Sequence, residues 1–171
     1  VNTGFGPMAD FTVNKEDQIK LQYNLIRSHS SGMGAVLPTK VVKSIMIIRL
    51  HTFLQGKSGV SQSLINTLSN YIDNGIYPDI YEHGGVGASG DLVQLAHLAL
   101  GIIGEGKGVN NEGKKDYVSK LIKGSNLQPH KLELRDGLAI INGTACMTAL
   151  SAINIINSRG LIKWSIKISA M

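Results

Sequence analysis

A chain of 171 residues has the length of a single domain and is long enough to bury a hydrophobic core. With 43% hydrophobic and 17% charged residues it falls among soluble globular proteins, although it is poor in charged and aromatic side chains. The net charge of +5 comes from lysines scattered along the sequence, and no basic run interleaved with aromatic residues predicts a nucleic-acid partner.

The single cysteine and the shortness of the apolar runs indicate the cellular compartment. The single cysteine, Cys146, lies in an apolar helical pattern, where a buried structural thiol is expected rather than a nucleophile. It has no partner for an internal disulfide, which fits a reducing cytoplasm. No charged-then-apolar leader opens the sequence, and no apolar run reaches the roughly eighteen residues of a membrane span. We therefore expect a soluble cytoplasmic protein without a membrane partner.

Apolar residues at helical spacing predict three helices in the first half of the chain. The first begins after Asn14, whose side chain can cap it, and ends before Ser30. The second is expected to be capped by Thr39 and to stop at Gly56. The third contains the apolar positions between residues 64 and 72. These patterns predict a mainly α protein.

The second half of the chain continues the helical pattern. From Asp91 onward the residues up to 103 are apolar on nearly every side, which predicts a helix buried in the interior. Residues 104–128 are polar and contain glycine, so we expect a surface excursion with some helix near 117–122. Thr144 can start another apolar helix to about Asn157, and residues 161–171 resemble the beginning of one more.

A glycine-rich loop precedes the predicted buried helix. Residues 85–90 satisfy the spacing G-x-G-x-x-G of dinucleotide-binding loops. That interpretation needs a buried apolar strand immediately upstream, but residues 80–83 are short and polar. Asp91 would also place a carboxylate where the pyrophosphate should bind. The serine-hydrolase pattern G-x-S-x-G fails as well, because residue 91 is not glycine. The plain alternative is a glycine loop leading to a helix capped by Asp91.

The loop also has the residue types that backbone cyclisation needs. Ring closure requires the Gly90 amide nitrogen to approach the Ala88 carbonyl carbon, and glycine makes that approach feasible. Ser89 then supplies a β-hydroxyl that can leave as water. The product is 4-methylidene-imidazol-5-one, a strong electrophile. The positive end of the following helix would favour negative charge that develops there.

Four blocks of the sequence resemble, in this order, the histidine and aromatic amino-acid ammonia-lyase family. The blocks are residues 1–6 (VNTGFG), 28–32 (SHSSG), 84–98 (GGVGASGDLVQLAHL) and 137–144 (GLAIINGT). The resemblance implies the N-terminal portion of the helical ammonia-lyase fold, which is fumarase/aspartase-like, with the electrophile loop at the start of a buried helix. Residues 1–171 are then expected to be the electrophile-bearing part of a longer chain, without its start and its C-terminal helical bundle.

The resemblance also implies which residues form the site. The expected catalytic residues, which form or support the ring, are Ala88, Ser89, Gly90 and Asn142. The expected substrate-binding residues are Gly6, Ser28, His29 and Leu92. The family's catalytic tyrosine would lie just before Val1, and its carboxylate-binding arginine lies in the bundle. The 171 residues alone are therefore expected to be inactive.

The implied reaction is elimination: the substrate amine adds to the methylidene, a base removes a β-proton, and ammonia leaves. The pair Ser28-His29 resembles histidine ammonia-lyases, which make urocanate, whereas residues 25–32 also resemble bacterial tyrosine ammonia-lyases, which make p-coumarate. Both L-histidine and L-tyrosine therefore remain possible substrates. An aromatic amino-acid 2,3-aminomutase that uses the same ring and a non-catalytic helical interaction domain are the alternatives.

The residues around the glycine loop argue against a nucleotide cofactor, and the five histidines share no metal-ligand spacing with one another or with Cys146. We therefore predict no metal. The implied assembly is a homotetramer whose active sites are shared between subunits, with a small aromatic amino acid as substrate.

Overall fold

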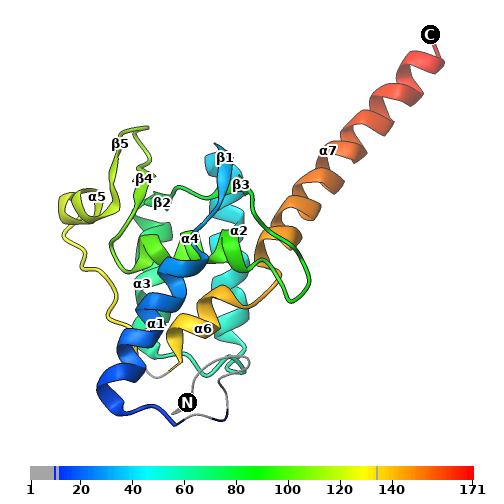
Figure 1. Ribbon diagram of the computed structural model, residues 1–171. Coiled ribbons are helices and arrows are strands. Elements are labelled where there is room, and N and C mark those ends of the chain that lie inside the picture. The colour runs from blue at the N-terminus through cyan, green and yellow to red at the C-terminus, as the bar shows by residue number, and fades with distance from the viewer. Residues whose placement is uncertain (1–9, 11, 134) are drawn as a thin grey trace.

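The computed structural model describes residues 10, 12–133 and 135–171 (Figure 1). Helices dominate this part of the chain, as the sequence predicts. The helices are α1 (Lys15–His29), α2 (Thr39–Leu54), α3 (Gln62–Asp73), α4 (Leu92–Ile102), α5 (Val118–Gly124), α6 (Asp136–Ile141) and α7 (Ala145–Ser169). The strands are β1 (Met33–Val36), β2 (Tyr77–Pro78), β3 (Tyr81–His83), β4 (Lys107–Val109) and β5 (Lys115–Tyr117).

Helix α4 is the centre of the fold, which confirms the predicted buried helix. All residues from 94 to 99 are buried, and α1, α6 and the first turns of α7 pack against it. Helix α2 packs on α3 and α7 and completes the core. The largest fully buried side chains include Phe53 of α2, Tyr71 of α3 and Leu98 of α4. The glycine loop therefore leads into a helix that is largely buried.

The strands form two small antiparallel sheets, one of β1 and β3 and one in the order β2-β4-β5. Strand β3, which precedes the glycine loop, is two-thirds exposed along its length and pairs only with β1 among the described residues. A dinucleotide loop follows a buried parallel strand, so the fold does not support that interpretation. The polar segment 104–128 contains α5, as predicted. It also contains the β4–β5 hairpin, whose strands are too short for the sequence pattern to predict.

Helix boundaries test the capping predictions. The Asn14 side chain accepts a hydrogen bond from the Asp17 backbone at 2.9 Å, so the predicted cap is confirmed. Thr39 is instead the first residue of α2, and Pro38 occupies the cap position without a side-chain hydrogen bond. The predicted break before residue 161 is wrong, because α7 continues through Gly160 in a single helix.

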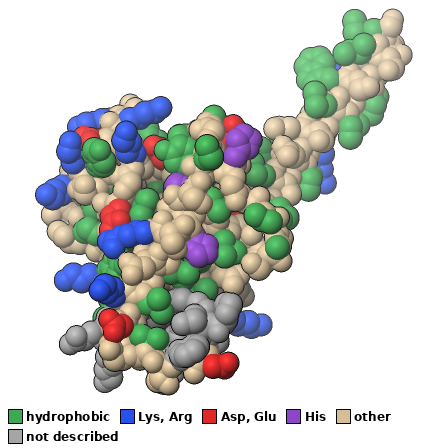
Figure 2. All heavy atoms as spheres, viewed as in Figure 1, with side chains coloured by type: hydrophobic (Ala, Val, Ile, Leu, Met, Phe, Trp, Pro, Cys, Tyr) green, Lys and Arg blue, Asp and Glu red, His purple; other side chains and the backbone are tan. Residues whose placement is uncertain are grey.

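Helix α7 leaves the body of the molecule and points away from it (Figure 1). After residue 150 all but Ile153 are exposed, and Figure 2 shows hydrophobic side chains along the projecting part. By length and composition, Asp136–Ser169 is the one described segment able to cross a membrane. A single such segment is weak support for a membrane span, because core helices of soluble proteins meet the same criteria.

The first turn of α7 belongs to the core. Ala145, Cys146 and Ala149 are buried there. Burial, together with the nearby Asp91 carboxylate, raises the pKa of the Cys146 thiol to about 11. The thiol is therefore protonated at neutral pH, which agrees with the predicted structural role.

Candidate functional site

The predicted electrophile residues lie in the loop between β3 and α4. Ala88 and Ser89 are exposed, and Gly90 has a positive φ of 111°. A Cβ on Gly90 would lie 2.6 Å from the carbonyl oxygen of Gly143, so only glycine fits. The next residue, Asp91, donates its backbone N–H to the same oxygen at 2.7 Å. The end of the loop thus rests on the turn that carries Asn142.

The beginning of the loop meets the segment after α1. A Cβ on Gly84 would lie 3.3 Å from the Cα of Gly32, and Gly84 has a φ of 119°. Gly32 in turn donates its backbone N–H to the Nε2 atom of His97 at 3.0 Å. Three of the four sequence blocks therefore adjoin around the start of α4. The first block, including Gly6, lies outside the described residues.

His97 of α4 holds this arrangement in its neutral form. Because Nε2 accepts the hydrogen bond from Gly32, the ring proton lies on Nδ1. Burial lowers the pKa of His97, which keeps the imidazole uncharged. The ring also contacts Tyr81 edge to face, with 4.9 Å between the ring centroids.

Ser28 and His29 form the last turn of α1. The Ser28 hydroxyl donates to the carbonyl of Leu25 at 3.0 Å, and His29 Nδ1 lies 2.9 Å from the same oxygen. A carbonyl oxygen only accepts, so Nδ1 of His29 carries a proton. Ser28 is exposed and His29 is half-buried. Leu92, the first residue of α4, is also half-buried, so these three predicted substrate contacts are all accessible.

A buried cation lies behind Asn142. Arg49 of α2 is 4% exposed, and its Nη2 donates to the carbonyl of Asn142 at 2.7 Å and to the carbonyl of Ala139. Its guanidinium carbon lies 4.9 Å from the ring centroid of Phe53. Burial lowers the pKa of Arg49 to about 10, and the Asp91 carboxylate opposes this. Arg49 therefore remains charged at neutral pH and fixes the backbone of the Asn142 turn.

Asp91 is not the cap that the sequence predicts. It occupies the cap position of α4 without a side-chain hydrogen bond to that helix. Its Oδ2 instead accepts the backbone N–H of Met147, in the first turn of α7, at 2.9 Å. The carboxylate thus joins the helix after the glycine loop to the helix after Asn142.

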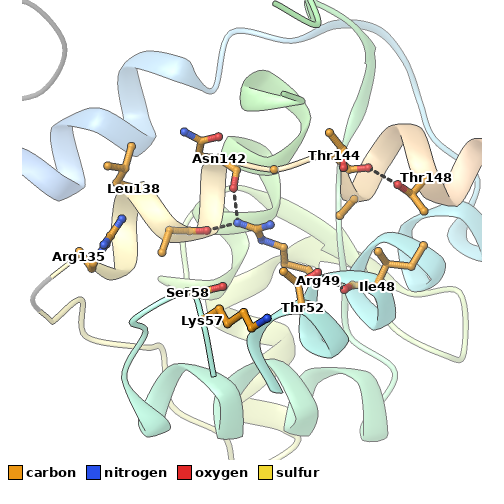
Figure 3. A pocket seen from close by; sticks show the side chains of 13 residues that line it. Ile48, Arg49, Thr52, Lys57, Ser58, Arg135, Leu138, Asn142, Thr144 and Thr148 are labelled. Atoms are coloured by element: carbon orange, nitrogen blue, oxygen red, sulfur yellow. Dashed lines mark hydrogen bonds between the residues drawn. The ribbon is translucent and has the colours of Figure 1, made fainter. Parts of the chain in front are cut away.

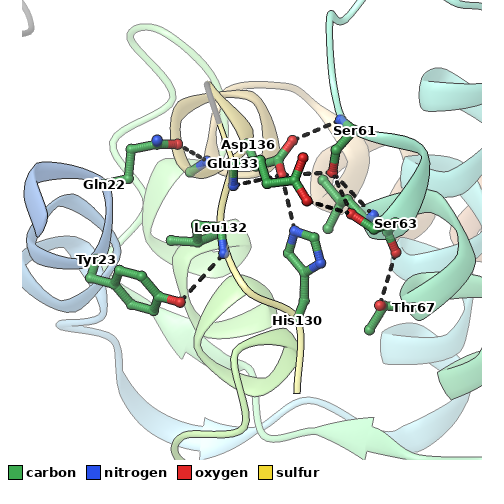
Figure 4. A network of polar contacts seen from close by, with 11 residues as sticks. Gln22, Tyr23, Ser61, Ser63, Thr67, His130, Leu132, Glu133 and Asp136 are labelled. Atoms are coloured by element: carbon green, nitrogen blue, oxygen red, sulfur yellow. Dashed lines mark hydrogen bonds and ion pairs between the residues drawn. The ribbon is translucent and has the colours of Figure 1, made fainter. Parts of the chain in front are cut away.

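A buried polar network anchors α6, the helix that ends at Asn142 (Figure 4). The Asp136 carboxylate lies 2.9 Å from His130 Nε2 and accepts from the Ser61 backbone and hydroxyl at 2.9 and 2.8 Å. It also accepts the Glu133 backbone N–H at 3.1 Å. Burial favours the protonated acid, but these hydrogen bonds prevail and lower the pKa of Asp136. The network holds α6 to the start of α3.

The glycines, Ser89 and Asn142 are visible in the sequence as motifs, whereas three supporting residues are not. Asp91 is predicted only as a cap of its own helix, and Arg49 and His97 fall within predicted helices with no role assigned to them. Two of them carry a usable signal, because Arg49 interrupts the apolar run 45–50 and His97 interrupts the apolar run 95–100. Among the described residues there is no cluster of three or more His, Cys, Asp or Glu side chains able to hold a metal ion.

Comparison with solved structures gives the fold a context. A histidine ammonia-lyase from Trypanosoma cruzi matches with a TM-score of 0.87 and 30% identity, over 94% of this chain and 31% of that chain. A tyrosine aminomutase from Streptomyces globisporus matches with a TM-score of 0.80 and 37% identity, over 88% of this chain and 28% of that chain.

Sequence relatives point in the same direction. The histidine ammonia-lyase of Bacillus cytotoxicus is 40% identical over 171 residues, which are 100% of this chain and 34% of that protein. The probable histidine ammonia-lyase of Thermoplasma volcanium is 44% identical over 154 residues, which are 90% of this chain and 31% of that protein. The chain thus spans about a third of the length of these relatives. The sequence profile described as aromatic amino acid lyase matches residues 1–171, and the chain belongs to that family.

Proposed function

We propose that this chain is the electrophile-bearing part of an ammonia-lyase that eliminates ammonia from an aromatic L-amino acid. The observation that carries the proposal is the contact between the loop and the Asn142 turn. A Cβ on Gly90 would lie 2.6 Å from the Gly143 carbonyl oxygen, and a Cβ on Gly143 would overlap the Arg49 guanidinium, so neither position has room for a side chain. A loop held this tightly beside an exposed Ala88-Ser89 pair favours cyclisation over plain flexibility.

The residues present fit a 4-methylidene-imidazol-5-one made from Ala88, Ser89 and Gly90. When formed, this group supplies an electrophile that converts the substrate amine into a better leaving group. Gly90 provides the bare backbone nitrogen that ring closure needs, and its positive φ is one that other residues rarely adopt. We propose that Asn142 supports the ring. Arg49 holds the Asn142 carbonyl, and the Asp136 network holds the helix that ends at Asn142.

Ser28, His29 and Leu92 are proposed to contact the substrate, together with Gly6. Histidine is favoured by the names of the sequence relatives, which are histidine ammonia-lyases. Tyrosine, with p-coumarate as product, is the other substrate proposed. A 2,3-aminomutase is the second candidate function, and the 37% identity with a tyrosine aminomutase of known structure favours it.

A homotetramer with shared active sites is proposed for the whole protein. The support comes from α7, where apolar side chains project from the body of the molecule. Leu161 is 70% exposed and Trp164 is 64% exposed. Large apolar side chains gathered on one projecting helix are typical of surfaces that another protein segment covers.

The test uses the full-length protein with L-histidine, L-tyrosine and L-phenylalanine. Elimination yields a conjugated acid that absorbs in the near ultraviolet, and Ser89→Ala should abolish it while Ser151→Ala, at an exposed position on α7, leaves it intact. A β-amino acid as the main product would establish the mutase instead. Full activity of Ser89→Ala would overturn both functions.

Exchanging the pair Ser28-His29 tests substrate choice. If these side chains line the pocket, the ratio of kcat/KM for histidine to that for tyrosine should change by about tenfold or more. An unchanged ratio would show that specificity resides elsewhere in the protein.

A further inference from the structure

A pocket of about 390 Å³ lies behind the Asn142 turn, between α2, α6 and the first turn of α7 (Figure 3). Three cationic side chains, Arg49, Lys57 and Arg135, line it. In Figure 3 the Arg49 guanidinium lies between Asn142 and Thr52, Lys57 lies below it on the loop after α2, and Arg135 lies farther away at the start of α6. The lining residues, which all belong to the described part of the chain, include no Asp or Glu. The pocket is therefore strongly cationic.

Arg49 has hydrogen-bonding capacity that the described residues do not use. Its Nη2 donates to two carbonyl groups, but its buried Nε has no partner among the described residues. A buried N–H of a charged group without an acceptor is costly, and an unmatched one marks a position where an acceptor is expected. The nearby Asp91 carboxylate makes no hydrogen bond to this Nε, and its Oδ2 accepts the backbone N–H of Met147 instead.

The remaining walls also suit an anion. The pocket reaches Thr144 and Ala145 at the N-terminal end of α7, a 25-residue helix whose dipole favours negative charge there. The hydroxyls of Thr52, Ser58 and Thr148 also line it; Thr52 and Thr148 donate to the carbonyls of Ile48 and Thr144, whereas the Ser58 hydroxyl can donate to an anion. Guanidinium, ammonium and hydroxyl donors around one space match a small oxyanion.

We propose that this pocket is a binding site for an oxyanion, either free phosphate or an acidic side chain from another part of the full-length protein. The anion accepts hydrogen bonds from Arg49 and ion-pairs with Lys57 and Arg135. Because Arg49 also holds the Asn142 carbonyl, the bound anion fixes the turn from its far side. The site does not depend on the proposed lyase function, since its test measures binding alone.

Lys57 and Arg135 are exposed, so they can be changed without disturbing the core. The test is calorimetric titration of the full-length protein with inorganic phosphate at constant ionic strength. Three proteins are compared: the unchanged protein, Lys57→Gln/Arg135→Gln, and a control, Lys43→Gln/Lys131→Gln, which removes the same charge at exposed positions outside the pocket. The first variant should weaken phosphate binding by about tenfold or more, and the control should bind like the unchanged protein.

A second measurement separates the two sources of the anion. If the unchanged protein does not bind phosphate, a crystal structure of the full-length protein should show an Asp or Glu carboxylate within hydrogen-bond distance of Arg49. That result supports the site with an intramolecular anion. The proposal is overturned if phosphate does not bind and no carboxylate reaches Arg49, or if the control variant weakens binding as much as the pocket variant.

Discussion

The Asp91 carboxylate accepts the backbone N–H of Met147 at 2.9 Å, so a residue at the start of α4 caps α7. A side-chain acceptor in the first turn satisfies an otherwise unpaired N–H, and its charge favours the helix dipole. We predict that Asp91→Ala lowers the free energy of unfolding by about 1–2 kcal/mol, measured by urea denaturation. Asp91→Asn keeps an acceptor and should lose less. Equal losses of stability in both variants would show that the hydrogen bond to Met147 does not stabilise the fold.

Gly90 and Gly87 provide a matched pair within the loop. Both have positive φ, but a Cβ on Gly87 meets nothing within 4 Å, whereas a Cβ on Gly90 meets the Gly143 carbonyl. Gly87→Ala should cost about 1 kcal/mol of stability, and Gly90→Ala about 2 kcal/mol or more. Gly90→Ala should also block ring formation, which intact mass reports. If the two variants behave alike, the contact with Gly143 is unimportant.

His97 predicts a pH dependence of stability. Its pKa is lowered from 6.5 by burial, so the folded state favours the neutral ring. The contribution of His97 is complete above pH 6.5 and declines as pH falls towards the lowered pKa, because the unfolded chain takes up the proton first. His97→Gln keeps an acceptor for Gly32 but does not titrate. Unfolding measured between about pH 7.5 and about pH 5 should show a weaker pH dependence for this variant; identical profiles would contradict the assignment.

Asp136 is the centre of the network that anchors α6. Replacing it with Asn places an amide N–H₂ among donors and removes the negative charge and one of the two acceptor oxygens, so the free energy of unfolding should fall by about 3 kcal/mol. Since the folded pKa is lowered, the carboxylate stabilises the fold above pH 3.8 and loses its effect as pH falls through that lowered value. Asp73→Asn, at an exposed position of α3, is the control and should leave the unfolding midpoint nearly unchanged. A small loss for Asp136→Asn would mean that the network does not anchor α6.

The sequence predicts local features well. The Asn14 cap depends on a residue three positions away, and the buried character of α4 follows from the apolar residues within it. The cap of α7 comes from Asp91, 56 residues earlier, so no local pattern reveals it. The strands β1 and β3 are short and gain their stability from pairing across the chain, which also hides them.

The same distinction applies to the site. The triplet Ala88-Ser89-Gly90 is legible because ring closure needs those residue types in that order. Arg49 contributes through its position beneath Asn142, 93 residues away, and no pattern within α2 indicates which distant backbone an arginine there will contact. A motif therefore predicts which residues can react, whereas the residues that hold them in place are found only in the folded structure.

The central claim is that Ala88, Ser89 and Gly90 cyclise, and the intact mass of the full-length protein tests it most directly. Cyclisation and dehydration remove two waters, so the mass should be about 36 Da below that of the unmodified chain. Peptide mapping should place the loss in residues 84–92, and Ser89→Ala should not show the full loss. An active full-length enzyme with the unmodified mass and an intact Ser89 would contradict the account.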